Sequence, residues 1–267
     1  MRIRLIVFGA MFVPLLTSAL PVARSAGVEF EVASIKPTRS PFGVMGGCHG
    51  RNAHFGPTDM EAEVPVGRCV ITAGRLSHIM AIAFRIDVNK IGGRPDWEGP
   101  SRFDIEAKAE NPAPTQEELL EMLRVLLADR FKLEFSRETK LESGYALVIA
   151  KNGPKFKRAL PEEEKRFVFR GSNVNKRDAA EGQATPLNTV TGQNTSLHEI
   201  VEVLSRAAGA PVVDRTGLVD AYDFKLNWEP GEDLSGQLQQ QLGLKLESGK
   251  VPVEYMTIVS AEKPTEN

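Results

Sequence analysis

The strongest constraint on the fold is a pattern of predicted elements that occurs twice in the 267 residues. In each half, hydrophobic periodicity predicts a helix, a strand, a helix and then two strands. The strands FDIEAKA (103–109) and YDFKLNW (222–228) both place an aromatic residue, an aspartate and a large apolar residue in a row. Two further matches are RFKLEF (130–135) with GLKLES (243–248) and YALVIA (145–150) with YMTIVS (255–260). The sequence therefore predicts an α+β protein built from two related helix-strand-helix-strand-strand modules.

Capping signals mark where the expected helices begin. The first helix is expected from Leu76, where apolar residues recur with helical spacing. The signals for the other helices are the capping boxes Thr115–Glu118 and Ser196–Glu199 and the N-cap Asp233. The two strands that close each module are expected to pair as a hairpin, namely 132–135 with 145–150 and 244–248 with 253–261.

The predicted organisation begins with a signal peptide at residues 1–26. Arg2 and Arg4 precede the apolar run 5–16, and small residues follow. An uncleaved membrane anchor is the alternative, although the run is shorter than the ~20 residues that a helical span requires. The remaining parts are an N-terminal strand, a long loop and the first module (27–155), a polar linker with one strand at 166–170 (156–190), and the second module (191–267).

Charge argues against nucleic acid as a partner. Removing Arg2, Arg4 and Arg24 with the signal peptide reduces the 33 basic residues to 30, against 35 acidic ones, so the mature chain has a net charge of −5. Binding to phosphates depends on clustered Lys and Arg. The chain after residue 26 also lacks an apolar run long enough to span a membrane. We therefore expect a secreted or periplasmic protein that is soluble after cleavage.

Cys48 and Cys69 are the only cysteines. In an exported protein, a lone pair of this kind is expected to form a disulfide, which here would close the long loop. His49 and His54 lie inside that loop, so a Cys/His metal site is the alternative. Their spacing is not a standard zinc spacing, and an oxidising compartment would compete for the thiols. We therefore predict a disulfide, with no metal and no cofactor.

Motifs for catalysis are weak. The chain has no GxSxG nucleophile motif, and the glycines of IGGRPDW (91–97) lack the residues that complete a phosphate-binding loop. His49 and His54 are weak catalytic candidates, with Asp59 or Glu61 as neighbouring acids. His78 and His198 have similar places near the starts of the repeated helices, where a histidine more often lies on a polar face.

Several other residues have either a structural or a binding interpretation. Asp104 and Asp223 are equivalent in the two repeats and could form a two-acid site. Strand alternation instead favours a position facing solvent or a bond to a neighbouring backbone amide. Asp214 and Gly217 belong to a predicted turn, VDRTG (213–217). Trp97 and Trp228 could anchor a ligand or partner, or each could cover the hydrophobic face of its module.

Several stretches together resemble one particular family: FEVASIKP (30–37), GGRPDW (92–97), LLADRFKLEF (126–135), YALVIAKNGPK (145–155), PVVDRTGLVDAYDFKLNW (211–228) and QLGLKLES (241–248). This family is a domain of unknown function found in many copies in soil Acidobacteria, as small exported proteins and sometimes fused to membrane zinc peptidases of the antibiotic-sensor type. The resemblance covers nearly the whole mature chain and implies export and a fold, with no catalytic residues. Arg75 stands where relatives usually have a threonine. The element order alone is also similar to the periplasmic modules of secretins and TonB-dependent receptors, which bind proteins.

These observations favour a non-enzymatic binding or interaction module of the cell envelope, with another envelope protein or a cell-wall component as its partner. Strand addition at an exposed edge of the 132–150 or 253–261 sheets is one expected mode, and Val148→Pro would block it. An envelope hydrolase that uses His49 or His54 is the alternative, and so is a sensor or inhibitor partner of a membrane peptidase.

Overall fold

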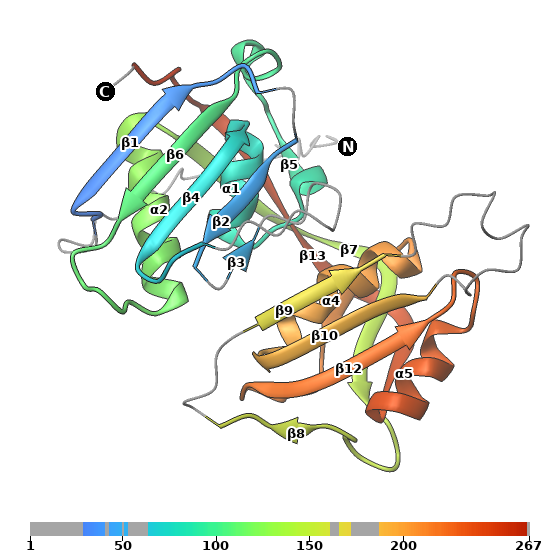
Figure 1. The fold of residues 1–267 in the computed structure, drawn as a ribbon. Helices are drawn as coiled ribbons and strands as arrows, with labels where there is room; N and C mark the ends of the chain where they lie inside the picture. Colours follow the sequence, from blue (N-terminus) through green and yellow to red (C-terminus); the bar gives the residue numbers. More distant parts are fainter. Residues whose placement is uncertain are drawn as a thin grey trace, which may run out of the picture.

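The computed structural model describes residues 29–40, 43–49, 51–52, 64–160, 166–171 and 187–265. The predicted signal peptide and the predicted site residue His54 lie outside these ranges. The described chain forms two lobes, each with a curved sheet, that are connected by two long strands, β7 and β13 (Figure 1). The α+β class is therefore confirmed. None of the helices described is long and apolar enough to cross a membrane.

The first lobe contains an antiparallel sheet with the strand order β1-β6-β4-β2-β3. Its strands are β1 (Val32–Pro37), β2 (Met45–Cys48), β3 (Arg51–Asn52), β4 (Arg68–Gly74) and β6 (Phe103–Lys108). Two helices, α1 (Leu76–Phe84) and α2 (Gln116–Arg130), pack against it and against each other. The short elements η1 (Val88–Lys90), β5 (Ile91–Gly92) and η2 (Asp96–Glu98) connect α1 to β6.

The second lobe contains a sheet with the order β8-β12-β10-β9, which matches β1-β6-β4-β2 strand for strand. Its elements are β8 (Lys157–Arg158), β9 (Arg166–Arg170), β10 (Asn188–Thr195), α4 (Leu197–Ala208), β11 (Val212–Asp214), β12 (Tyr222–Trp228) and α5 (Leu234–Leu242). The strand predicted at 166–170 is confirmed. Two further strands in the described part of the expected polar linker (156–190) belong to this sheet, namely β8 and the start of β10.

The third sheet, with the order β11-β7-β13-β5, joins the lobes. β7 (Glu134–Ile149) and β13 (Leu244–Ser260) are each one continuous strand, and they pair antiparallel from Leu244↔Ile149 to Ser260↔Glu134. The two expected hairpins are therefore wrong. Each pair of strand segments is part of a single strand whose paired residues lie 95 (244 − 149) to 126 (260 − 134) positions away. Local alternation does not reveal such a partner.

The ends of the long strands belong to different cores. Phe135 of β7 and Met256 of β13 pack in the first core, whereas Leu147 of β7 and Leu244 of β13 pack in the second. Each lobe is thus completed by one half of both strands. The chain passes from the first lobe to the second through β7 and returns through β13. The predicted boundary between two consecutive modules at 156–190 therefore stays a prediction.

The β7–β13 ladder occupies one edge of each long strand, and β11 and β5 pair with only short parts of the outer edges. Val148 pairs with Lys245 inside the β7–β13 ladder, so Val148→Pro would damage the fold and would not test an edge. Leu246 directs its N–H away from β7, to Ser235 Oγ. By alternation Pro252 also faces outward, where its missing N–H interrupts the outer edge of β13.

A matching irregularity precedes α1 and α4. The register shifts between Ile71 and Gly74 in β4, and between Gly192 and Thr195 in β10. Within these bulges, Ala73 (φ 55°) and Asn194 (φ 46°) have left-handed backbone conformations. The two lobes therefore turn from strand into helix in the same way.

Candidate functional site

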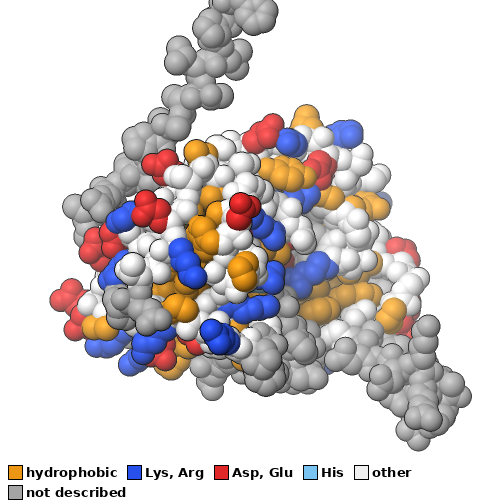
Figure 2. Space-filling view, turned by 90° about the horizontal axis from the view of Figure 1, so that it is seen from above, with side chains coloured by type: hydrophobic (Ala, Val, Ile, Leu, Met, Phe, Trp, Pro, Cys, Tyr) orange, Lys and Arg blue, Asp and Glu red, His pale blue; other side chains and the backbone are white. Residues whose placement is uncertain are grey.

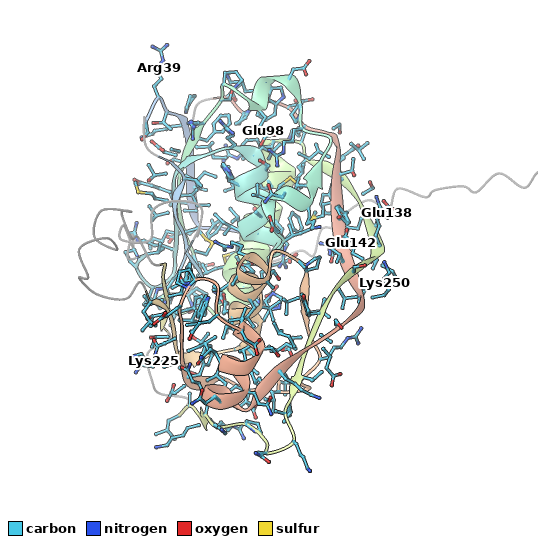
Figure 3. All side chains as sticks on the ribbon, turned by 90° about the vertical axis from the view of Figure 1, so that its right-hand side faces the viewer. Arg39, Glu98, Glu138, Glu142, Lys225 and Lys250 are labelled. Atoms are coloured by element: carbon cyan, nitrogen blue, oxygen red, sulfur yellow. A yellow bond between two sulfur atoms is a disulfide. The ribbon has the colours of Figure 1, made fainter. Side chains whose placement is uncertain are left out.

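A cavity of about 570 Å³ lies between the two lobes, and we call it the interlobe cleft. It is bounded by the C-terminal half of α1 with η1, by α4, by the segment leading into β11, and by the middle of β13. Glu138 and Glu142 mark the neighbouring middle of β7, between the two lobes (Figure 3). A volume of this size is typical of sites for small ligands.

Most of the cleft wall is apolar. Its apolar side chains are Ala81, Ile82, Phe84, Ile86, Val88, Val201, Ala210, Pro211, Val212, Val213, Pro252 and Val253. Phe84 also contacts Phe135 edge to face, with ring centroids 4.8 Å apart, which fixes the wall on the side of the first lobe. The wall can therefore bury the apolar body of a ligand.

A polar cluster joins η1 to the central strands beside the cleft. Lys90 Nζ donates to Tyr255 Oη at 2.8 Å and to Glu142 Oε2 at 3.2 Å, and Tyr255 Oη also donates to Glu142. Burial by itself would lower the pKa of Lys90, but its bonds to Tyr255 and Glu142 outweigh this and raise that pKa. The hydrogen bond from Tyr255 lowers the pKa of Glu142, and Lys90 adds to this effect. The cluster holds both groups charged and fixes this side of the cleft.

Two arginines line the cleft from opposite lobes. Arg85 follows α1, and Arg206 lies in the last turn of α4. Arg85 Nη2 contacts Gln116 Oε1 at 3.1 Å and Glu117 Oε2 at 3.3 Å. Arg206 forms an ion pair with Glu202 at 3.9 Å. Positive charge at the end of each helix complements the helix dipole.

A second polar cluster lies at the start of α1. Glu98 is only 2% exposed, and its Oε1 accepts the Ser77 N–H at 2.8 Å, which satisfies a free donor of the helix N-terminus. Burial, followed by the charge of Arg75, lowers the pKa of His78 to about 4. Arg94 and Arg102 lower it further, against an opposing effect of Glu98. His78 is therefore neutral at physiological pH.

His78 and His198 do not have equivalent positions. Leu76 and Leu197 both begin their helices, so His198 corresponds to Ser77. His78 corresponds to the buried Glu199. His198 is exposed and lines the cleft, whereas His78 lies at the other end of the first lobe's helix. The structure therefore does not bring the two histidines together as a pair.

The predicted disulfide between Cys48 and Cys69 is confirmed. The two residues are cross-strand partners in β2 and β4, and both are fully buried. Next to them, His49 Nδ1 lies 2.7 Å from the carbonyl oxygen of Val64. His54, Asp59 and Glu61 lie outside the described residues. Within the part of the chain that is described, no three His, Cys, Asp or Glu residues gather as a metal site would require.

The equivalent aspartates make equivalent bonds. Asp104 Oδ1 accepts the Ala73 N–H, and Asp223 Oδ1 accepts the Asn194 N–H, both at 2.8 Å. Each therefore binds a backbone amide within the bulge of its own lobe. The geometry provides no two-acid site between the lobes, because each carboxylate is engaged with the strand next to its own.

The predicted turn residues have local contacts. Asp214 Oδ1 accepts both the N–H of Thr216, at 2.8 Å, and its hydroxyl, at 2.7 Å. Gly217 follows with φ 71°, a conformation that favours glycine. These contacts define a turn after β11.

Both tryptophans pack against hydrophobic cores. Trp97 stacks on Phe131 and donates its Nε1–H to the Ala261 carbonyl at 3.3 Å. Trp228 is 5% exposed and stacks on Phe169. Neither lines the interlobe cleft.

Apart from His198, the residues of the interlobe cleft were missed by sequence reasoning. A signal was present, because Arg85 and Arg206 follow Leu76 and Leu197 by the same nine positions. One arginine thus lies at the same position after each helix start. Only the pairing of the long strands brings these two helix ends to one cavity.

Lys, Arg, Asp and Glu are interspersed with apolar side chains on the face shown in Figure 2.

Comparison with known proteins identifies one family. A model described as a protein of unknown function, DUF3738, matches residues 77–261, which include most of both lobes. No curated protein and no solved structure matches the chain. The chain therefore belongs to the DUF3738 family of proteins of unknown function.

Proposed function

We propose that this protein is an exported, non-enzymatic binding protein of the cell envelope, and that the interlobe cleft is its ligand site. The observation that carries the proposal is the cleft itself, which has apolar walls from both lobes and charged groups among them. Pockets that bind ligands commonly combine an apolar lining with a few fixed polar groups and lie between domains.

The charged groups around the cleft support binding over proton transfer. Lys90 and Glu142 hold each other in their charged forms, and Asp87 Oδ1 accepts the Asn89 N–H at 2.8 Å. General acid–base catalysis instead favours a group whose pKa lies near the working pH. These side chains are suited to orienting a ligand.

Export is supported by the signal-like N-terminus and by the disulfide. Cys48 and Cys69 are buried and bonded, and disulfides are typical of oxidising compartments. The matching strand orders, bulges and aspartate contacts of the two lobes support an origin by internal duplication. A role as the sensor or inhibitor partner of a membrane peptidase stays a prediction from the resemblance.

Native mass spectrometry of protein purified from its own envelope tests the proposed site. We expect wild-type protein to retain a bound molecule and Ala210→Trp, which fills the cleft, to lose it. Ala113→Trp is the matched control, since Ala113 is exposed in a loop and does not line the cleft. A bound molecule that persists in Ala210→Trp, or a wild-type protein that carries none, would contradict the proposal.

A further inference from the structure

Arg85, which lines the cleft, has a guanidinium group with unused hydrogen-bonding capacity. Arg85 Nε is buried and has no hydrogen-bond partner among the described residues. The guanidinium group is otherwise engaged only through Nη2, with Gln116 and the half-exposed Glu117. A buried donor without an acceptor is unfavourable and is rare in native proteins. Because Arg85 lines the cleft, a rearrangement of its guanidinium group would let a ligand supply the missing acceptor.

Most of the other charged groups that line the cleft already have a partner of opposite charge. Lys90 is held by Glu142 and Tyr255, and Glu254 by Arg137 at 3.0 Å. Ser205 Oγ donates to the Val201 carbonyl and accepts the Val212 N–H. A ligand in the cleft would therefore place its hydrogen-bond acceptor on Arg85 and its apolar part against the rest of the wall.

The surroundings of Arg85 favour a negative charge on that acceptor. Glu117 is 57% exposed, so its ion pair with Arg85 is weak and can be rearranged. Bonds between a guanidinium group and a carboxylate are stronger than bonds to a neutral acceptor. Ile82, Ile86 and Val88 lie close to Arg85 in sequence and line the same wall.

We propose that the interlobe cleft binds an amphipathic carboxylate, with the alkyl chain between the apolar walls and the carboxylate on Arg85. This inference rests on the proposed function, because it names the ligand class of the same site. The carboxylate accepts from the guanidinium group of Arg85 as the weak ion pair with Glu117 rearranges, and the chain extends toward Val201 and Val253. A longer chain removes more apolar surface from water, so each added methylene group tightens binding about three- to fourfold until the cleft is full.

Isothermal titration calorimetry with three probes of equal chain length tests the ligand class: decanoate, decanol and decylammonium. We expect decanoate to bind at least ~10-fold more tightly than decanol, since a charged hydrogen bond replaces an unmade one. Hexanoate and octanoate should bind progressively more weakly than decanoate. Equal binding of all three probes, or a preference for decylammonium, would overturn the role of Arg85.

Arg85→Met retains the length of the side chain and removes its charge. We expect this variant to bind decanoate only as tightly as decanol, with binding of decanol unchanged. Arg85→Lys should retain part of the preference for decanoate, and it serves as a second variant if the methionine variant does not fold. Decanoate binding that both variants leave unchanged would overturn the proposal. If wild type binds no decanoate while Ala210→Trp still loses its native ligand, then the ligand class is wrong and the cleft remains the site.

Discussion

The two lobes share an order of strands and helices, yet they are stabilised in different ways. In the first lobe, the disulfide joins β2 to β4, and Glu98 satisfies the N-terminus of α1. In the second lobe, the matching strands β9 and β10 are joined by ladder hydrogen bonds, and Ser196 makes no side-chain cap on α4. The contacts between Asp104 and Ala73 and between Asp223 and Asn194 are the same in both.

This difference indicates which features the fold itself requires. The bulge and its aspartate direct the chain from the sheet into the helix, and both lobes retain them. Among the described residues, the disulfide and the Glu98 contact occur in the first lobe alone, so the fold does not depend on them to form a lobe. They add stability to the first lobe. The predictions below test this distinction.

The largest expected effect is removal of the disulfide by Cys48→Ala with Cys69→Ala. The bond closes a loop with a sequence separation of 21 residues. Its loss should lower the free energy of unfolding by about 3 kcal/mol, because the unfolded chain regains entropy. Hydrogen exchange should show the loss in β2 and β4 while β9 and β10 change little. Equal loss in both lobes would show that they unfold as one unit.

The aspartates should have equal effects in the two lobes. Asp104→Ala and Asp223→Ala each leave a bulge amide without its acceptor, and each should cost about 1–2 kcal/mol in urea denaturation. The matched controls are Asp104→Asn and Asp223→Asn, which retain an acceptor oxygen and should cost less than the alanine variants. A large loss in one lobe and none in the other would show that the equivalent geometry has unequal importance.

The smallest expected effect concerns the pH dependence due to His78. Its pKa is lowered to about 4 in the folded protein, so the unfolded chain binds more protons below the ordinary value of 6.5. Stability should therefore fall as the pH decreases from 6.5 to 4, by about 1 kcal/mol once solvent screening is considered. His78→Gln should flatten this part of the stability curve. His198→Gln is the control, and an unchanged curve for His78→Gln would contradict the assignment.

The sequence predicted local features well. The helix expected from Leu76 spans Leu76–Phe84, and Thr115 and Glu118 form the expected capping box of α2. The disulfide followed from two cysteines in a chain with a signal-like N-terminus. These features depend on periodicity and on neighbours within a few residues, which a single sequence contains.

Other predictions failed where distant contacts decide the outcome. The segment from Ser136 to Ser143 is rich in charged residues, so it suggested a turn between two strands. In the structure it continues β7, because it pairs throughout with β13. The expected capping box at Ser196 also failed, since Ser196 makes no side-chain capping bond. A charged segment can belong to a strand when its backbone groups find a partner elsewhere in the chain.

The sequence by itself determined the repeated elements, the helix limits, the disulfide and the equivalence of Asp104 with Asp223. Only the tertiary structure decided that β7 and β13 cross between the lobes and that Arg85 and Arg206 line one cleft. The physical reason is that helix periodicity and capping are local properties. Strand partners and cavities arise from contacts between residues far apart in the chain, whose pairing no local pattern specifies.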